Sequence, residues 1–242
     1  MLGEQQCMSV KVLVIPHAGG MASAYYEFSK YADSNVDFVF VELAGRGARM
    51  REDLYEDFEE AVNDIYEKNI NLFQQENYVL FGHSMGSWLA FELYHKIKAE
   101  GQPLPVHLFF SGNVSPFAQR FSNYRNMSDE EFIENIFKKG QTSKEIFINR
   151  ELREIFLPIL RSDFKMLEEY VPKNGRDPIT SNISVLCGSE DPLLKNGVIE
   201  WEELTTKECE IIYFEGNHFY LFKNMSDIVD YIHRTVEMYN II

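Results

Sequence analysis

Short apolar runs alternate with longer amphipathic segments along most of the chain. The short runs are rich in β-branched residues and nearly continuously apolar, which is typical of strands covered on both faces. The longer segments repeat their apolar residues at helical spacing. The predicted strands are Val10–Ile15, Val36–Leu43, Tyr78–Phe81, Val106–Phe110, Ile183–Leu186 and Cys209–Phe214, and the predicted helices are Asp57–Phe73, Met85–Ala99, Val198–Leu204 and Ser226–Tyr239.

This order of elements predicts an α/β fold in which a mostly parallel sheet has crossover helices on both faces. The regular alternation stops between Ser111 and Ile183, where helical periodicity continues without a strand signal. Ser128 and Glu131 have the spacing of a helix capping box, and a second helical run covers 151–170. We predict a single domain over 1–242 with a helical lid inserted at about 115–178; a helical layer packed on the core is the alternative.

Composition restricts the possible partners. The 242 residues carry a formal net charge of -15, which opposes binding to nucleic acid or to anionic membranes. Three widely separated cysteines favour neither a disulfide framework nor a zinc site, so we expect no bound metal. The first nine residues lack a basic cluster and an apolar core, so we expect a cytoplasmic protein, and we expect it to be a monomer.

Two small basic clusters stand out in this acidic chain. Arg46, Arg49 and Arg51 lie in one loop, and Lys138 and Lys139 lie in another. Each cluster could dock a partner locally, or it could simply be a solvated loop, as short charge runs usually are.

The chemistry begins where the strand Tyr78–Phe81 runs into Gly82-His83-Ser84-Met85-Gly86 and then into a helical pattern. This strand, G-x-S-x-G turn and helix form the context of a nucleophile elbow, in which a strained serine projects above the sheet. Small residues two positions to either side are needed for the turn to close. We therefore predict Ser84 as a nucleophile.

A serine nucleophile needs a histidine base, and that base needs a carboxylate to orient it. In α/β-hydrolases these residues follow in the order serine, acid, histidine at the ends of strands. Asp191 follows the strand Ile183–Leu186, and His218 follows the strand Cys209–Phe214. We predict Asp191 as the acid, with its neighbour Glu190 as the rival, and His218 as the base.

The oxyanion of the tetrahedral intermediate needs two donors. The backbone N–H of Met85 follows the nucleophile and provides the first. The loop from Pro16 to Gly20 follows the first strand, and we expect its Ala18 N–H to be the second donor, with Gly19 as the alternative. His17 is expected to be a loop or pocket residue rather than a proton carrier.

Together these motifs resemble the type II thioesterases of polyketide and nonribosomal peptide synthesis, which have the α/β-hydrolase fold. The resemblance covers about residues 10–239. Two departures from the family pattern are Ala44, where proline is usual, and Asn217, where glycine is usual. The matching segments are the Pro-His-Ala-Gly-Gly loop, 43–47, 81–86, 128–132, 157–164 and 188–192.

The resemblance implies hydrolysis of acyl groups from the phosphopantetheine thioester of acyl or peptidyl carrier domains. It implies no cofactor, because the substrate itself carries the phosphopantetheine. His17 and Gly19 would then line the substrate site, together with Phe132 and Phe137 from the apolar stripe of the predicted lid. A carboxylesterase or an acyltransferase with the same triad remains an alternative, as does a non-catalytic binding protein.

Overall fold

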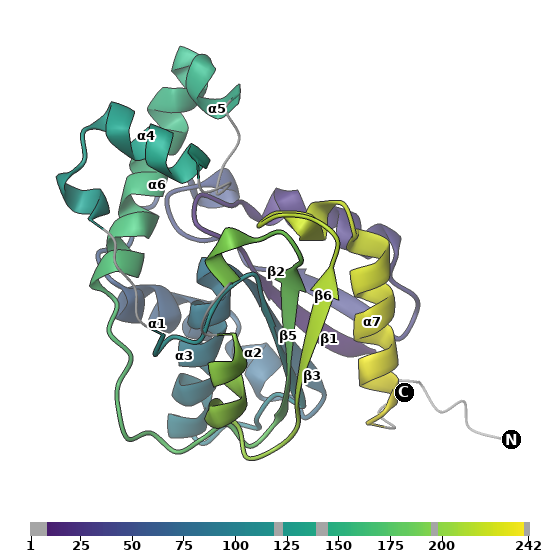
Figure 1. Cartoon of the computed structure of the whole chain (residues 1–242). Coiled ribbons are helices and arrows are strands. Elements are labelled where there is room, and N and C mark those ends of the chain that lie inside the picture. Colours follow the sequence, from purple (N-terminus) through teal and green to yellow (C-terminus); the bar gives the residue numbers. More distant parts are fainter. Residues whose placement is uncertain (1–8, 119–122, 139–144, 195–197, 240–242) are drawn as a thin grey trace, which may run out of the picture.

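The computed structural model in Figure 1 describes residues 9–118, 123–138, 145–194 and 198–239. Cys7 and Lys139 lie outside these ranges. A sheet of six parallel strands in the order β2-β1-β3-β4-β5-β6 forms the centre of the molecule. The strands are β1 (Val10–Ile15), β2 (Val36–Phe40), β3 (Tyr78–His83), β4 (His107–Ser111), β5 (Asn182–Gly188) and β6 (Cys209–Phe214).

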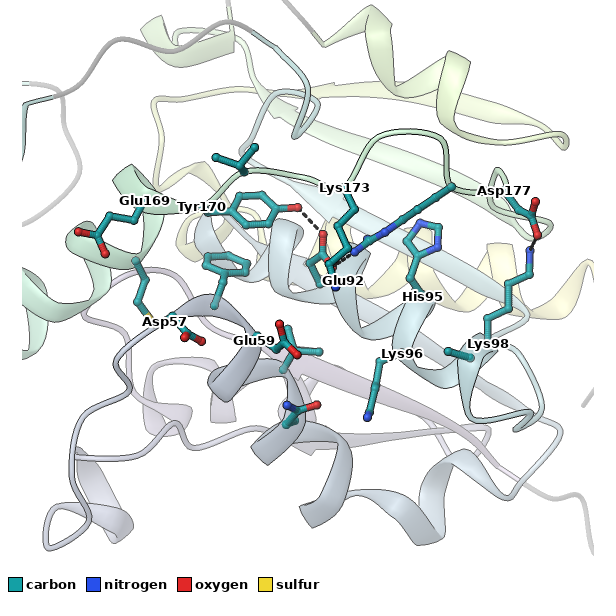
Figure 2. Close-up of a pocket in the computed structure, with 17 residues that line it drawn as sticks. Asp57, Glu59, Glu92, His95, Lys96, Lys98, Glu169, Tyr170, Lys173 and Asp177 are labelled. Atoms are coloured by element: carbon teal, nitrogen blue, oxygen red, sulfur yellow. Dashed lines mark hydrogen bonds and ion pairs between the residues drawn. The ribbon is translucent and has the colours of Figure 1, made fainter.

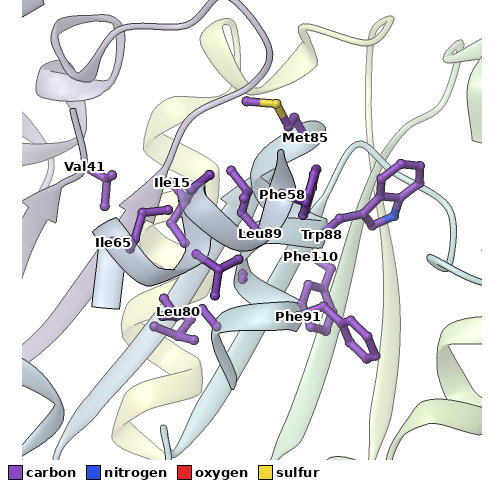
Figure 3. Close-up of a cluster of buried hydrophobic side chains, with 14 of the residues drawn as sticks. Ile15, Val41, Phe58, Ile65, Leu80, Met85, Trp88, Leu89, Phe91 and Phe110 are labelled. Carbon is purple, nitrogen blue, oxygen red and sulfur yellow. The ribbon is translucent and has the colours of Figure 1, made fainter. Parts of the chain in front are cut away.

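Helices cover both faces of this sheet, so the predicted α/β fold class is confirmed (Figure 1). Successive residues of a strand point to opposite faces, and the core is divided accordingly. The covering helices are α1 (Phe58–Lys68), α2 (Ile70–Phe73), α3 (Met85–Ala99) and α7 (Met225–Glu237). Leu13 and Leu80 pack with α1 and α3 on one face, where Figure 3 shows Leu80. Val12 and Val79 pack with α7 on the other face.

Several predicted boundaries differ from the structure. The second strand ends at Phe40 rather than Leu43, and Asn69 divides the predicted helix Asp57–Phe73 into α1 and α2. A 3-10 helix at Ala22–Lys30 was not predicted at all. Its buried residues Ala22, Tyr25 and Phe28 recur every third position, which is the 3-10 period and was the signal available in the sequence.

Among the described residues between β4 and β5, every named element is helical, and non-helical segments at 112–118 and 170–181 lie between these elements and the sheet. The elements include α4 (Asp129–Lys138), α5 (Glu145–Ile148) and α6 (Arg150–Glu169), which lie beyond one end of the sheet in Figure 1. The capping box is confirmed, since Ser128 N–H donates to Glu131 Oε2 over 2.8 Å and Glu131 N–H donates to Ser128 Oγ over 3.2 Å. The limits of the insertion and its action as a lid remain predictions.

We expect Ile232→Ala to lower the free energy of unfolding by about 2–5 kcal/mol, because Ile232 of α7 is fully buried against the sheet. Ile199→Ala is the matched control, since Ile199 is 59% exposed and its loss should cost less than about 0.5 kcal/mol. Urea denaturation of both variants measures the difference. Similar losses in the two variants would contradict the packing described for α7.

Candidate active site

Ser84 lies in a sharp turn between β3 and α3. Its φ of 54° makes it the single non-glycine residue with positive φ in the described part of the chain, and such a conformation is strained for a residue with a side chain. Hydrogen bonds hold its backbone: Ser84 N–H donates to Ser111 O over 2.7 Å, and Ser84 O accepts from Asn113 Nδ2 and from Ser87 N–H, each over 2.9 Å. The turn therefore has the geometry of a nucleophile elbow.

The glycines on either side of Ser84 are needed for steric reasons. A Cβ on Gly82 would collide with the backbone of Gly86, and a Cβ on Gly86 would collide with the carbonyl of Ile15. Both obstacles are main-chain atoms, which cannot move aside as a flexible side chain can. The G-x-S-x-G pattern is therefore a requirement of close backbone packing among β3, α3 and β1.

The structure brings Ser84, His218 and Asp191 into one chain of hydrogen bonds. His218 Nδ1 lies 2.7 Å from Asp191 Oδ2, and His218 Nε2 lies 2.9 Å from Ser84 Oγ. A carboxylate can only accept, so Nδ1 carries the proton and Nε2 is left to accept from the serine hydroxyl. The side chains of His218 and Asp191 are 2% and 0% exposed, respectively, which keeps water from competing for these bonds.

Asp191, and not Glu190, is the carboxylate that contacts His218. The Asp191 side chain is buried, and its other oxygen accepts from Leu193 N–H over 2.9 Å. Glu190 is exposed, although its backbone N–H bonds to Gly216 O in the loop that carries His218. This backbone bond links the two loops that follow β5 and β6.

The predicted oxyanion donors lie on two elements. Met85 is the first residue of α3, and Ala18 lies in the loop after β1. Gly19 N–H already donates to Asp163 Oδ2 over 2.7 Å, so it is occupied. Within the described residues, neither the Ala18 N–H nor the Met85 N–H donates to a protein acceptor, which leaves both for a ligand oxygen.

His17 and His83 lie beside His218 but do not hydrogen-bond to its imidazole ring, whose partners are Asp191 and Ser84. Burial, together with the charges of His218 and Arg46, lowers the pKa of His17 to about 3. Its Nδ1 lies 2.6 Å from Tyr25 OH, which also accepts from the His17 backbone N–H over 3.2 Å. Burial likewise lowers the pKa of His83 well below its usual value. Both rings are therefore neutral near pH 7, as expected of His17 if it is not a proton carrier.

The two phenylalanines predicted to line the substrate site differ in placement. Phe132 of α4 is fully buried, and its ring packs edge-on against Tyr124 and Phe164 with the Arg161 guanidinium 4.3 Å from the ring centroid. Phe137 is only half-buried. Phe132 thus belongs to the interior of the insertion, whereas Phe137 lies nearer its surface.

In the loop that contains Arg46, Arg49 and Arg51, the Arg46 side chain neither faces solvent nor is available to dock a partner. That side chain is fully buried and forms two hydrogen bonds to Asp163 of α6, at 2.6 and 2.7 Å. Arg49 is half-buried and pairs with Asp64 and Glu52, while Arg51 is exposed. Sequence reasoning missed Asp163, although it lies in one of the segments that resemble the family.

The two departures from the family pattern have local explanations. Ala44 N–H donates to Tyr55 OH over 3.0 Å, a bond that a proline could not make. Asn217 Oδ1 accepts from Phe219 N–H over 3.0 Å, which braces the loop that carries His218. Neither residue disturbs the hydrogen bonds that join Ser84, His218 and Asp191.

A separate groove of about 750 Å³ runs along α1, α3 and the segment after α6 (Figure 2). Its lining is of mixed charge, with the Glu92–Arg176 and Lys98–Asp177 pairs, and contains neither Ser84 nor His218. The described residues form no cluster of three metal-binding side chains. They also include no helix long and apolar enough to cross a membrane.

The chain is similar to thioesterases and to proteins of peptide and polyketide biosynthesis along most of its length. A family model described as a thioesterase domain matches residues 10–236. The gramicidin S biosynthesis protein GrsT of Aneurinibacillus migulanus is 29% identical, over 92% of this chain and 87% of GrsT. The crystal structure of ClbQ from the colibactin NRPS/PKS pathway superposes with a TM-score of 0.91, at 33% identity over 97% of this chain and 99% of ClbQ. RedJ, the thioesterase of the prodiginine pathway in Streptomyces coelicolor, has a TM-score of 0.83 at 27% identity, over 91% and 89% of the two chains.

We expect the stability of the protein to fall in acid partly through His17. The pKa of His17 is about 3 in the folded state and about 6.5 when unfolded. At pH values between these two pKa values, the unfolded chain binds a proton on His17 that the folded chain does not bind. The stabilisation present above pH 6.5 is therefore lost as the pH falls toward 3. At pH 5, His17→Gln should take up about one proton fewer on unfolding than the wild type.

The measurement is the slope of unfolding free energy against pH, from denaturation at several pH values. Tyr25→Phe is the control, because it removes the hydroxyl bonded to His17 but keeps the buried imidazole. It should retain the wild-type slope. Equal slopes for His17→Gln and the wild type would show that His17 titrates normally in the fold.

Proposed function

The chain belongs to the thioesterase family, and we propose that it hydrolyses acyl thioesters held on the phosphopantetheine arm of carrier domains in a synthetase. The observation that carries the proposal is the chain of hydrogen bonds from Asp191 through His218 to Ser84. This is the arrangement that turns a weak serine hydroxyl into a nucleophile. Ser84 is the proposed nucleophile, His218 the base and Asp191 the acid.

In the proposed first step, Ser84 Oγ attacks the thioester carbonyl while its proton moves to His218 Nε2. Asp191 holds the Nδ1–H tautomer and stabilises the imidazolium that forms. The developing oxyanion is bound by the N–H groups of Ala18 and Met85, and each such donor is typically worth about 3 kcal/mol in the transition state. Collapse of the intermediate breaks the carbon–sulfur bond, and His218 protonates the departing thiolate.

In the second step, His218 removes a proton from a water molecule, which attacks the acyl-Ser84 ester. The same two donors stabilise the second oxyanion, and Ser84 recovers its proton from His218 as the free acid leaves. Every proton transfer is between the imidazole and a reacting oxygen or sulfur. No step requires a cofactor.

The relatives support the choice of a carrier-bound substrate. GrsT is a gramicidin S biosynthesis protein, and ClbQ belongs to an NRPS/PKS pathway. The match covers 97% of this chain and 99% of ClbQ, so the similarity to ClbQ includes the helical insertion as well as the sheet. We propose that the present chain likewise serves a synthetase pathway, as a monomeric, cytoplasmic enzyme with carrier domains as partners.

The insertion is the proposed cover for the acyl chain. Its contact with the site is supported by the bond from Asp163 of α6 to the loop that holds Ala18. Burial of an acyl chain under this cover stabilises the complex by about 25 cal/mol per Å² of apolar area. Phe137 and His17 are retained as proposed pocket residues, while the interior packing of Phe132 gives it an indirect role.

We expect Ser84→Ala to lower kcat by at least about a thousandfold, because it removes the nucleophile. Asp191→Asn should lower kcat by about 10⁴-fold, because the amide favours the wrong imidazole tautomer. Hydrolysis of an acyl-pantetheine thioester, followed by thiol release, provides the measurement for both. Circular dichroism confirms that each variant is folded.

Glu190→Gln is the matched control for the acid. Glu190 is the next residue along the chain, is exposed and makes no contact with His218, so its variant should keep nearly the wild-type kcat. If Glu190→Gln were the more damaging change, the acid would have to be reassigned. A Ser84→Ala enzyme with more than a tenth of the wild-type rate would exclude Ser84 as the nucleophile.

The substrate class is tested with a matched panel of one acyl group on a carrier protein, on free pantetheine and on a simple alcohol. We expect kcat/KM to be highest for the carrier-bound thioester and lowest for the alcohol ester, because the carrier adds binding energy remote from the reacting carbonyl. Preference for the alcohol ester would support a carboxylesterase. Acyl transfer to an added amine or alcohol in place of water would support an acyltransferase.

A further inference from the structure

The loop that holds Ala18 is bound directly by the helical insertion. Gly19 N–H donates to Asp163 Oδ2 over 2.7 Å, although the two residues are 144 positions apart in the chain. Gly19 follows Ala18, so this bond restrains the neighbouring peptide unit. The position of Ala18 N–H therefore depends on α6 as well as on β1.

Asp163 is fixed in turn by a buried arginine. Arg46 Nη1 and Nη2 donate to the two carboxylate oxygens of Asp163 at 2.6 and 2.7 Å, and both side chains are 0% exposed. A bidentate pair of this kind sets the plane of the carboxylate as well as its place. Asp163 is thereby held in the orientation that accepts from Gly19.

Packing leaves the loop little room to move away from α6. Gly19 has a φ of 76°, which favours glycine, and a Cβ at this position would meet the side chain of Leu160. Leu160 lies nearly one helical turn before Asp163 and is also buried. Gly19 is thus held between a hydrogen bond and an apolar contact from the same helix.

We propose that Asp163, oriented by Arg46, is a positioning residue that sets the Ala18 N–H for the oxyanion. The inference rests on the proposed function, and it adds that half of the oxyanion hole is preorganised by the insertion. Preorganised donors act only on the charge that develops in the transition state. Loss of the Asp163 acceptor should therefore lower kcat while KM changes little.

A transition-state probe tests this directly. When a trifluoromethyl ketone analogue of an acyl-pantetheine binds, Ser84 Oγ forms a bond to the carbonyl carbon. The carbonyl π pair becomes the oxyanion, and the serine proton moves to His218. Affinity for this ketone reports on the oxyanion donors, whereas labelling of Ser84 by a fluorophosphonate reports whether the serine is activated at all.

The key comparison uses two double variants, Arg46→Met with Asp163→Leu, and Arg46→Met with Asp163→Asn. Both remove the two buried charges together, so neither variant leaves one charge buried alone. The side chains at position 163 are then similar in size and neutral, but only asparagine can accept from Gly19 N–H. Arg49→Met with Asp64→Leu is the control, because it removes an ion pair between the same loop and α1 that does not include the acceptor of Gly19 N–H.

We expect the leucine variant to lose about ten- to a hundredfold in kcat and a similar factor in ketone affinity, with KM nearly unchanged. The asparagine variant should recover most of both losses, and the Arg49 control should resemble the wild type. Equal kcat and ketone affinity in the leucine and asparagine variants would overturn the proposal. A loss confined to KM would do the same.

Hydrogen exchange of the wild-type Gly19 amide provides a test that needs no variant. The amide should exchange far more slowly than the exposed amides of neighbouring loops, and exchange at their rate would overturn the proposal. Failure of the proposed catalytic triad is distinguishable, because the wild type itself would then neither react with the fluorophosphonate nor bind the ketone. Failure of the proposed substrate class alone would leave both probes active and would appear only in the panel of carrier, pantetheine and alcohol substrates. A wild type that does both, with no difference between the double variants, contradicts only the role of Asp163.

Discussion

The left-handed backbone at Ser84 is the constraint on which the rest of the site depends. Such a conformation costs about 1–3 kcal/mol and persists only where its surroundings determine it. Here the neighbouring strand supplies an acceptor from Ser111, the following loop supplies a donor from Asn113, and two glycines allow the close approach of α3. Because the acceptor from Ser111 lies at the end of β4, the pairing of β3 with β4 also helps to orient Ser84 Oγ toward His218.

Burial determines which of the groups around His218 carry a charge. Asp191 is buried and hydrogen-bonded, so its negative charge faces the imidazole with little screening by water. Burial keeps His17 and His83 neutral, although their rings lie close by. Neither ring therefore places a second positive charge beside His218 in the proposed step in which that residue accepts the serine proton.

The insertion and the sheet meet at a buried ion pair rather than at an apolar contact alone. Arg46 comes from the loop after β2 and Asp163 from α6, so their bidentate pairing ties two distant segments to the loop after β1. Burying two charges is costly unless their hydrogen bonds are satisfied, and here Gly19 N–H supplies a further donor. The pair thus specifies one arrangement of the loop against the insertion.

The sequence by itself determined the strands, the elbow and the order of Ser84, Asp191 and His218, because backbone periodicity and strand-end position are local properties. Only the tertiary structure decided between Asp191 and Glu190, since both follow β5 and the path of the turn selects which one faces His218. It also showed that Gly19 N–H donates to Asp163, which leaves Ala18 as the proposed oxyanion donor, and it placed Phe132 inside the insertion. These outcomes depend on contacts between segments far apart in the chain, and local spacing carries no information about them.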